Sequence, residues 1–180
     1  MTLKYFGEHV KTISDKVSCG VAISVPVDLA SSSRTMGTFK NKIYMYKFLR
    51  SLRKKILIKN QKYPDYKLDI KKLLKSKTFK EFDGLYTAPV SGFSGPEDYW
   101  EKASSKPYLT SIKKPVLLIT SSDDPFLAQE CYPFKEAEKS NYFYLEVTKY
   151  GGHVGFISSL FSKKNRWLEN RILQFIKDNG

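Results

Sequence analysis

Apolar residues near the amino terminus recur at the spacing of one face of an α-helix. This stripe predicts a helix over residues 2–16 and consists of Leu3, Phe6, Val10 and Ile13. A nearly unbroken apolar run follows at residues 17–25, which is typical of a strand buried on both faces of a parallel sheet. Pro26 ends this strand, and the serines at 31–33 predict a loop after it.

The middle of the chain, residues 34–111, shows helical periodicity and contains no strand candidate of comparable strength. We expect its main helices at residues 41–58, 69–75 and 96–104. The first of these is expected to have an apolar face made of Tyr44, Phe48 and Leu52. Pro64 is expected to end that helix, because the residue before a proline disfavours the helical conformation.

Strands and helices alternate again after residue 111. The pattern predicts a strand at 116–120, a helix at 125–139, a strand at 142–148 and a helix at 165–177. With the first strand this gives an α/β fold of about three parallel strands with crossover helices. The sequence thus predicts core pieces at 1–33 and 112–180 and an inserted, Lys-rich helical cap at 34–111.

Three strands are few for an open α/β sheet. We therefore expect a preceding half of the chain, or a partner chain, to complete the sheet. Without it, the apolar stripe at Leu3, Phe6 and Val10 is expected to be exposed, which would lower solubility.

Two polar loops follow the last two predicted strands. The first carries Asp123 and Asp124, and the second carries His153 beside a glycine pair that can adopt positive φ. An acid and a histidine at neighbouring strand ends can pair, so that the carboxylate fixes the histidine tautomer and stabilises the imidazolium. Such a pair supplies two members of a hydrolytic triad. The same residues also fit an ordinary Asp-Pro turn and a loop histidine bonded to backbone.

The positive charge of the chain is concentrated in one segment. The net charge is +13, yet residues 40–80 hold 15 Lys or Arg against Asp65 and Asp69, and the remainder has 16 basic and 16 acidic residues. The segment fits a solvated lid over an acyl pocket, with apolar residues Tyr44, Phe48, Phe79 and Phe82. It also fits an interfacial helix on anionic lipid, with an apolar face of Tyr44, Phe48, Leu52 and Ile56. Nucleic acid is the least favoured partner, because no recognised binding module is present.

Composition narrows the class of protein. At 180 residues, with 41% hydrophobic and 14% aromatic content, the chain fits one globular domain with a sizeable core. No apolar run approaches the roughly 20 residues that span a bilayer, and the start lacks the apolar segment of a signal peptide. Cys19 and Cys131 form no CxxC motif, and the two histidines lie far apart, so we expect no metal and no cofactor. We expect a cytoplasmic protein, with membrane association left open.

Several short stretches carry a family resemblance when taken together. They are residues 3–8, residues 22–29, Phe82-Asp83 with Thr87-Ala88-Pro89, Gly92-Phe93 with Asp98-Tyr99-Trp100, residues 122–126 (Ser-Asp-Asp-Pro-Phe) and residues 151–156 (Gly-Gly-His-Val-Gly-Phe). In this order they resemble the C-terminal half of α/β-hydrolases, specifically the branch of the bacterial YheT-type esterases and the animal abhydrolase-domain lipases.

The resemblance implies roles for individual residues. His153 would be the triad histidine and Asp124 its acid, with Asp123 as a loop-capping or solvated acid. The family's nucleophile elbow, which resembles G-x-S-x-G-G-N, would precede Met1, because residues 4–8 match the helix that follows it. The near match around Ser94 has proline in place of the second glycine and no apolar strand before it, so Ser94 is expected to be a loop serine.

We therefore expect the C-terminal fragment of a serine carboxylic-ester hydrolase, of the esterase or lipase kind, that acts on acyl esters or lipids. The fragment is expected to be inactive alone, because the nucleophilic serine and the oxyanion hole are absent from it. The alternative is a non-catalytic pseudo-hydrolase or interaction fragment that binds anionic lipid or nucleic acid through the basic cap.

Overall fold

The computed structural model describes residues 1–63, 68–156 and 166–180 and divides the chain into two compact units. Unit 1 comprises Met1–Asp28 and Ser104–Gly180, and unit 2 comprises Leu29–Ala103. Both divisions lie a few residues before the predicted boundaries of the inserted cap. The predicted helix break at Pro64 and the predicted helix start at Asn165 lie outside the described residues.

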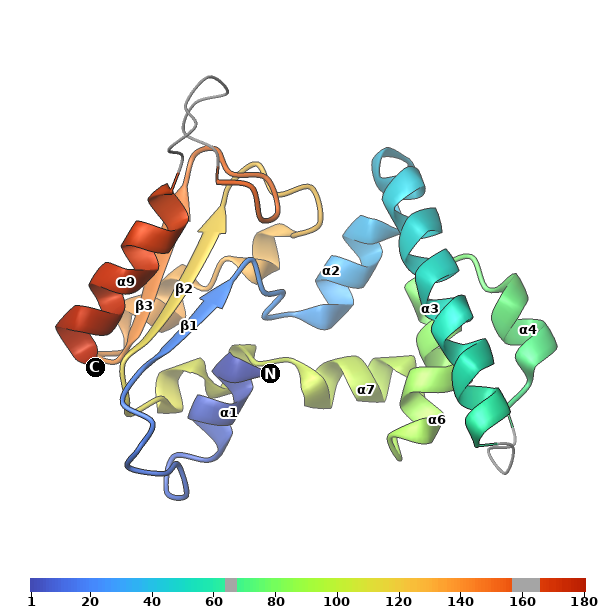
Figure 1. The fold of residues 1–180 in the computed structure, drawn as a ribbon, viewed down its shortest axis with the longest axis horizontal. Helices are drawn as coiled ribbons and strands as arrows, with labels where there is room; N and C mark the ends of the chain where they lie inside the picture. Colours follow the sequence, from blue (N-terminus) through green and yellow to red (C-terminus); the bar gives the residue numbers. More distant parts are fainter. Residues whose placement is uncertain (64–67, 157–165) are drawn as a thin grey trace. The chain divides into compact units, whose positions relative to one another are not determined.

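Unit 1 is built on a parallel sheet, which among the described residues has three strands in the order β1-β2-β3 (Figure 1). The strands are β1 (Gly20–Ile23), β2 (Val116–Ser121) and β3 (Phe143–Thr148). Ile23 pairs with Ile119, and Ser121 pairs with Thr148, so the carboxyl ends of the strands meet at one edge of the sheet. The predicted α/β fold is confirmed.

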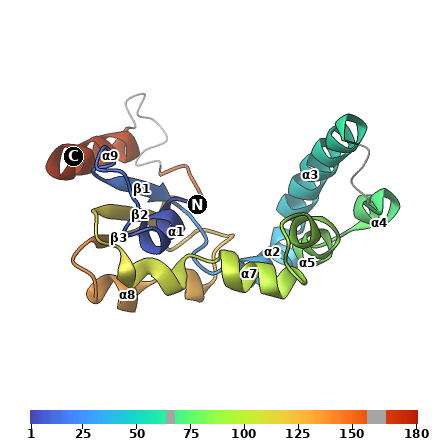
Figure 2. The ribbon, with the colours of Figure 1, turned by 90° about the horizontal axis from the view of Figure 1, so that it is seen from below.

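Successive residues of β2 face two different apolar layers, and every residue of this strand is buried. Leu118 belongs to a buried cluster that includes Leu3, whereas Ile119 belongs to a second cluster that includes Phe175. Helices α1 (Thr2–Glu8), η3 (Lys106–Ser111) and α8 (Phe134–Glu138) lie on the first face, and α9 (Trp167–Asn179) covers the second (Figure 2). Burial on both faces explains the unbroken apolar sequence of β2.

Two helices of unit 1 are shorter than the sequence predicts. α1 ends at Glu8 instead of continuing to residue 16, and a turn follows it. The predicted helix at 125–139 is wrong, because this connection contains only the short η4 (Gln129–Cys131) and α8. Pro133 separates them, and a proline has no backbone N–H with which to continue a helix. The predicted exposure of Leu3 and Phe6 is also wrong, since both are buried in the core of unit 1.

Unit 2 is helical, and its described residues contain no strand, as predicted. Its elements are α2 (Leu29–Met36), η1 (Phe39–Asn41), α3 (Lys42–Lys62), α4 (Ile70–Lys75), α5 (Phe79–Phe82), the π-helical turn η2 (Asp83–Thr87), α6 (Ala88–Val90) and α7 (Pro96–Ala103). The predicted loop at residues 31–33 is wrong, because these serines lie in α2. Ser31 and Ser32 are buried there, where their small side chains allow close packing.

The buried face of α3 differs from the predicted one. Met45, Leu49 and Ile56 are buried, whereas Tyr44 and Phe48 are exposed. Apolar residues occur on several sides of α3, so their spacing alone does not select the side that is buried. None of the helices in the described part of the chain combines the length and the hydrophobicity of a membrane-spanning segment.

The π-helical turn is fixed by a half-buried carboxylate. Asp83 accepts hydrogen bonds from the Thr87 hydroxyl (2.6 Å) and from Trp100 Nε1 (2.9 Å). Burial raises the pKa of Asp83, while these two hydrogen bonds act in the opposite direction. The side chain thereby connects η2 to α7.

Candidate active site

Asp124 lies just beyond the carboxyl end of β2, and its side chain has no exposed surface. Its Oδ1 accepts a hydrogen bond from the backbone N–H of Phe126 (2.9 Å), which closes a turn over Pro125. Its Oδ2 lies 2.8 Å from Nδ1 of His153. Both carboxylate oxygens therefore have partners, as a buried charge requires.

His153 lies on the loop that follows β3, and its side chain is 34% exposed. The N–H groups of Gly155 and Phe156 donate to the carbonyl of Gly151 and fold this loop into a tight turn (3.1 and 2.9 Å). A Cβ at residue 151 would meet Phe156 at 2.8 Å and Ser121 at 2.9 Å, so any residue other than glycine would force these side chains to move. Gly151 thus stands where the loop that carries His153 passes close to Ser121 at the end of β2.

The acid loop and the histidine loop are joined by further hydrogen bonds. Asp123 Oδ1 accepts from the N–H of Gly152 (2.8 Å), and the Ser121 hydroxyl donates to the carbonyl of Gly152 (2.6 Å). The Ser121 hydroxyl, followed by the N–H of Gly152, lowers the pKa of Asp123. Because that hydroxyl has a single proton, the Asp123 carboxylate and the Gly152 carbonyl compete for it. Asp123 thus anchors the loop that carries His153 and does not touch the imidazole itself.

Tyr132 and Phe126 support the pair, and sequence reasoning assigned no role to either. The Tyr132 hydroxyl donates to the carbonyl of Ser121 (2.8 Å). Burial, followed by the negative charge of Asp124, raises the pKa of Tyr132 to about 12, so it remains a neutral donor at ordinary pH. The Phe126 ring packs against the His153 ring with centroids 4.7 Å apart. Phe126 follows the acid motif directly, which could have drawn attention to it, whereas nothing in the sequence marks Tyr132.

The geometry sets the chemistry that His153 can perform. A carboxylate facing Nδ1 favours the neutral tautomer with its proton on Nδ1 and leaves Nε2 with a free lone pair. Among the described residues, Nε2 has no hydrogen-bond partner. The structure therefore brings together the two predicted site residues, Asp124 and His153, in the arrangement that a general base requires.

Ser94 is not part of this arrangement. It is exposed in the turn before α7 of unit 2, where its N–H donates to the Asp98 carboxylate (2.9 Å). It therefore does not occupy a strand-to-helix elbow. Within the described part of the chain, no group of three or more His, Cys, Asp or Glu side chains could hold a metal ion.

The chain is similar to proteins named as an esterase, a lipase and an abhydrolase domain-containing protein. The chain is 32% identical over 157 residues to the protein of Escherichia coli named esterase YheT. This alignment covers 87% of the present chain and 46% of the relative. The chain is 30% identical over 180 residues to the monoacylglycerol lipase of Saccharomyces cerevisiae, in an alignment that covers 96% of this chain and 39% of the lipase. Abhydrolase domain-containing protein 2 of Drosophila melanogaster is 27% identical over 189 aligned residues, with coverages of 98% and 47%.

The chain belongs to the α/β-hydrolase superfamily. It falls in the predicted YheT-type branch and spans less than half the length of these relatives. It matches no protein-family model, and no solved structure matches it. Asp124 precedes His153 in the chain, which is the order in which α/β-hydrolases carry their acid and histidine.

Proposed function

We propose that this chain supplies the general base and the orienting acid of a serine carboxylic-ester hydrolase. The observation that carries the proposal is the 2.8 Å contact between Asp124 Oδ2 and His153 Nδ1 at the carboxyl edge of the sheet. The reaction class is supported by relatives named as an esterase and a lipase.

In the proposed mechanism, Nε2 of His153 takes the proton of a serine hydroxyl as its oxygen attacks the ester carbonyl carbon. The protonated ring then gives that proton to the departing alkoxide, which leaves an acyl-enzyme. A water molecule, deprotonated by the same nitrogen, releases the acid and restores the serine. Asp124 stabilises the imidazolium in both half-reactions.

The nucleophilic serine and one oxyanion donor would come from an elbow outside these 180 residues, and the other donor from an earlier strand-to-helix loop. The near match around Ser94 is excluded from this role by its place in an exposed turn. Without a nucleophile the chain alone is expected to be inactive, since removing that group leaves only the residual rate from binding and electrostatics. The proposed substrates are acyl esters, including lipid esters.

A fluorophosphonate serine probe tests this proposal in the protein from its native source. We expect a labelled species heavier than 20.8 kDa that contains this sequence. Substitution His153→Ala at the native locus should abolish labelling, whereas His9→Ala should not. His9 is a matched control because it is the chain's other histidine and lies exposed next to α1. Detection of the protein only as an unlabelled 20.8 kDa species would contradict the proposed hydrolase activity and would favour the alternative of a non-catalytic interaction protein.

A second candidate function is contact with an anionic membrane surface through unit 2. Phe39 in η1 and Ile43 and Tyr46 in the first turns of α3 are spaced four and three residues apart, and they are 87%, 71% and 60% exposed. α3 contains lysine and arginine but no acidic residue. This combination suits an interfacial helix of a cytoplasmic, membrane-associated protein.

Flotation with vesicles tests this candidate. Binding should require phosphatidylserine in a phosphatidylcholine background and weaken with salt. Phe39→Ser together with Ile43→Ser should reduce it. Binding to pure phosphatidylcholine, or an unaffected double variant, would argue against the membrane contact.

A further inference from the structure

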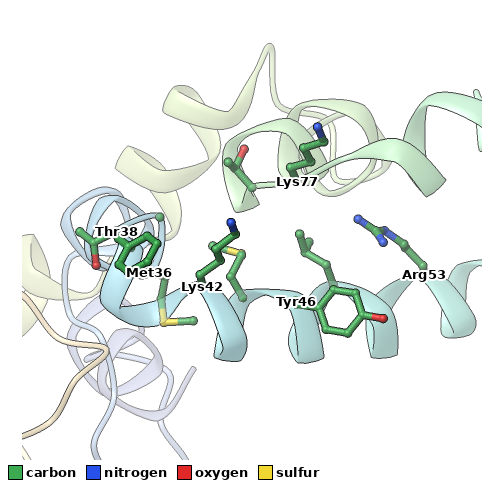
Figure 3. A pocket seen from close by; sticks show the side chains of 11 residues that line it. Met36, Thr38, Lys42, Tyr46, Arg53 and Lys77 are labelled. Carbon is green, nitrogen blue, oxygen red and sulfur yellow. The ribbon is translucent and has the colours of Figure 1, made fainter.

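A cavity of about 480 Å³ lies within unit 2. It is bounded by the end of α2, the first half of α3 and the segment that joins α4 to α5 (Figure 3). Its volume falls in the range of about 300–1,000 Å³ that is usual for small-molecule sites. Every lining residue belongs to unit 2, whereas Asp124 and His153 belong to unit 1, so the lining shares no residue with the proposed catalytic pair.

The floor of the cavity is apolar. Met36, Met45 and Leu49 are buried and line it. Methionine side chains are flexible and polarizable, so they adapt to ligands of irregular shape. An alkyl chain would gain favourable burial against this surface.

Three cationic side chains line the same cavity, namely Lys42, Arg53 and Lys77. One terminal guanidinium nitrogen of Arg53 donates to the carbonyl of Ser76. The Nε–H of the same arginine is buried and has no hydrogen-bond partner among the described residues. A buried donor without an acceptor is unfavourable, so an acceptor beside the guanidinium group would be favoured.

No acidic side chain lines the cavity, and none of the described residues forms a salt bridge with the three cations. The three cationic groups therefore have no carboxylate partner among the described residues, although the Glu81 carboxylate accepts the backbone N–H of Lys77 (2.7 Å). Guanidinium groups bind carboxylates with two parallel hydrogen bonds, and ammonium groups add point charges. The cavity thus combines an apolar floor with a carboxylate-binding group.

We propose that this cavity binds a free fatty acid, with the alkyl chain on Met36, Met45 and Leu49 and the carboxylate on Arg53, Lys42 and Lys77. Binding needs neither the nucleophile nor the Asp124–His153 pair. The 180-residue chain can therefore be tested as it is, and a failure here would leave the proposed hydrolase untouched.

Methionine methyl groups report occupancy directly. The chain has three methionines, of which Met36 and Met45 line the cavity and Met1 is fully exposed. In chain labelled with ¹³C at the methionine methyls, decanoate below its micelle concentration should shift the Met36 and Met45 signals saturably. The Met1 signal should not move. Decanol, which has the same chain and no charge, should bind about tenfold more weakly.

A pair of double variants separates carboxylate recognition from general charge. Lys42→Gln with Lys77→Gln should weaken decanoate binding about tenfold and leave decanol binding unchanged. Lys40→Gln with Lys47→Gln removes the same charge from lysines that do not line the cavity, and it should have little effect. Equal weakening by the two double variants, equally tight binding of decanol, or a Met1 shift that follows the same isotherm would each overturn the proposal.

Discussion

Replacing Asp124 by asparagine isolates the charge of the proposed orienting acid. Asparagine keeps the size of the side chain, and its carbonyl oxygen can still accept the N–H of Phe126 that closes the turn. The change removes the negative charge that lies 2.8 Å from His153 Nδ1. The fold should therefore persist while the histidine loses the partner that stabilises its protonated state.

The size of the effect follows from distance and burial. Two unit charges 2.8 Å apart attract each other by about 6 kcal/mol at an effective dielectric constant of about 20. The Asp124 side chain is fully buried, but the His153 side chain is 34% exposed, so water screens part of this energy. We expect about 4 kcal/mol of lost transition-state stabilisation, which corresponds to about a 10³-fold lower rate.

The assay is the rate of fluorophosphonate labelling in the complete protein, and Asp123→Asn is the matched control. The Asp123 side chain anchors Gly152 without touching the imidazole, and an asparagine carbonyl can still accept that N–H. We expect less than about a tenfold change for this control. In the 180-residue chain, long-range ¹H–¹⁵N spectra of neutral His153 should show the Nδ1–H tautomer in the wild type and a changed tautomer ratio in Asp124→Asn.

Two results would refute the reasoning. One is equal loss of labelling in Asp123→Asn and Asp124→Asn, because the contact to Nδ1 would then have no special weight. The other is an Nε2–H tautomer in the wild-type chain, because the Nδ1 contact would then lack a proton to donate to the carboxylate.

Three further predictions concern stability, measured by urea unfolding. Gly151→Ala should lower the free energy of unfolding by about 1–3 kcal/mol, because the added methyl group would overlap two buried side chains. Gly152→Asn should cost less, since residue 152 has open space around it and asparagine tolerates its φ of +57°. Similar losses in the two variants would contradict the crowding at residue 151. The pKa of Asp83 is raised in the folded state, so between the ordinary and the raised pKa the folded state binds more protons than the unfolded state. Stability should therefore fall as pH rises through that window, and Asp83→Asn should remove this decline. An unchanged slope of stability against pH in the variant would contradict the role of Asp83. Leu49→Ala should cost about 2–5 kcal/mol and Ile43→Ala less than about 0.5, and the reverse order would mean that α3 buries another face.

The sheet and the acid–histidine contact could be foreseen because they follow from local rules. Unbroken apolar runs mark strands buried on both faces, and parallel strands bring their carboxyl ends to one edge. The loops holding Asp124 and His153 were therefore expected to meet, as they do. Family resemblance supplied the choice between Asp123 and Asp124, which spacing alone left open.

Other features depend on packing that the sequence does not encode locally. The predicted face of α3 was wrong because apolar residues surround much of this helix, and only its neighbours select Leu49 over Phe48. The serines at residues 31–33 predicted a loop because serine is a weak helix former. In the structure they lie in α2, where their small side chains suit a buried helix face. Tyr132 reaches the Ser121 carbonyl from a separate segment, which no periodicity reveals.

The chain order of the three strands also bears on how the protein folds. β2 pairs with β3 across a short connection, whereas β1 pairs with β2 only after a loop that contains all of unit 2 has closed. That loop is roughly four times longer, which adds about 1 kcal/mol of closure entropy. Contacts between distant residues also slow folding. We therefore expect β2 and β3 to gain protection from hydrogen exchange first during refolding, so that the acid and histidine loops meet before β1 joins the sheet.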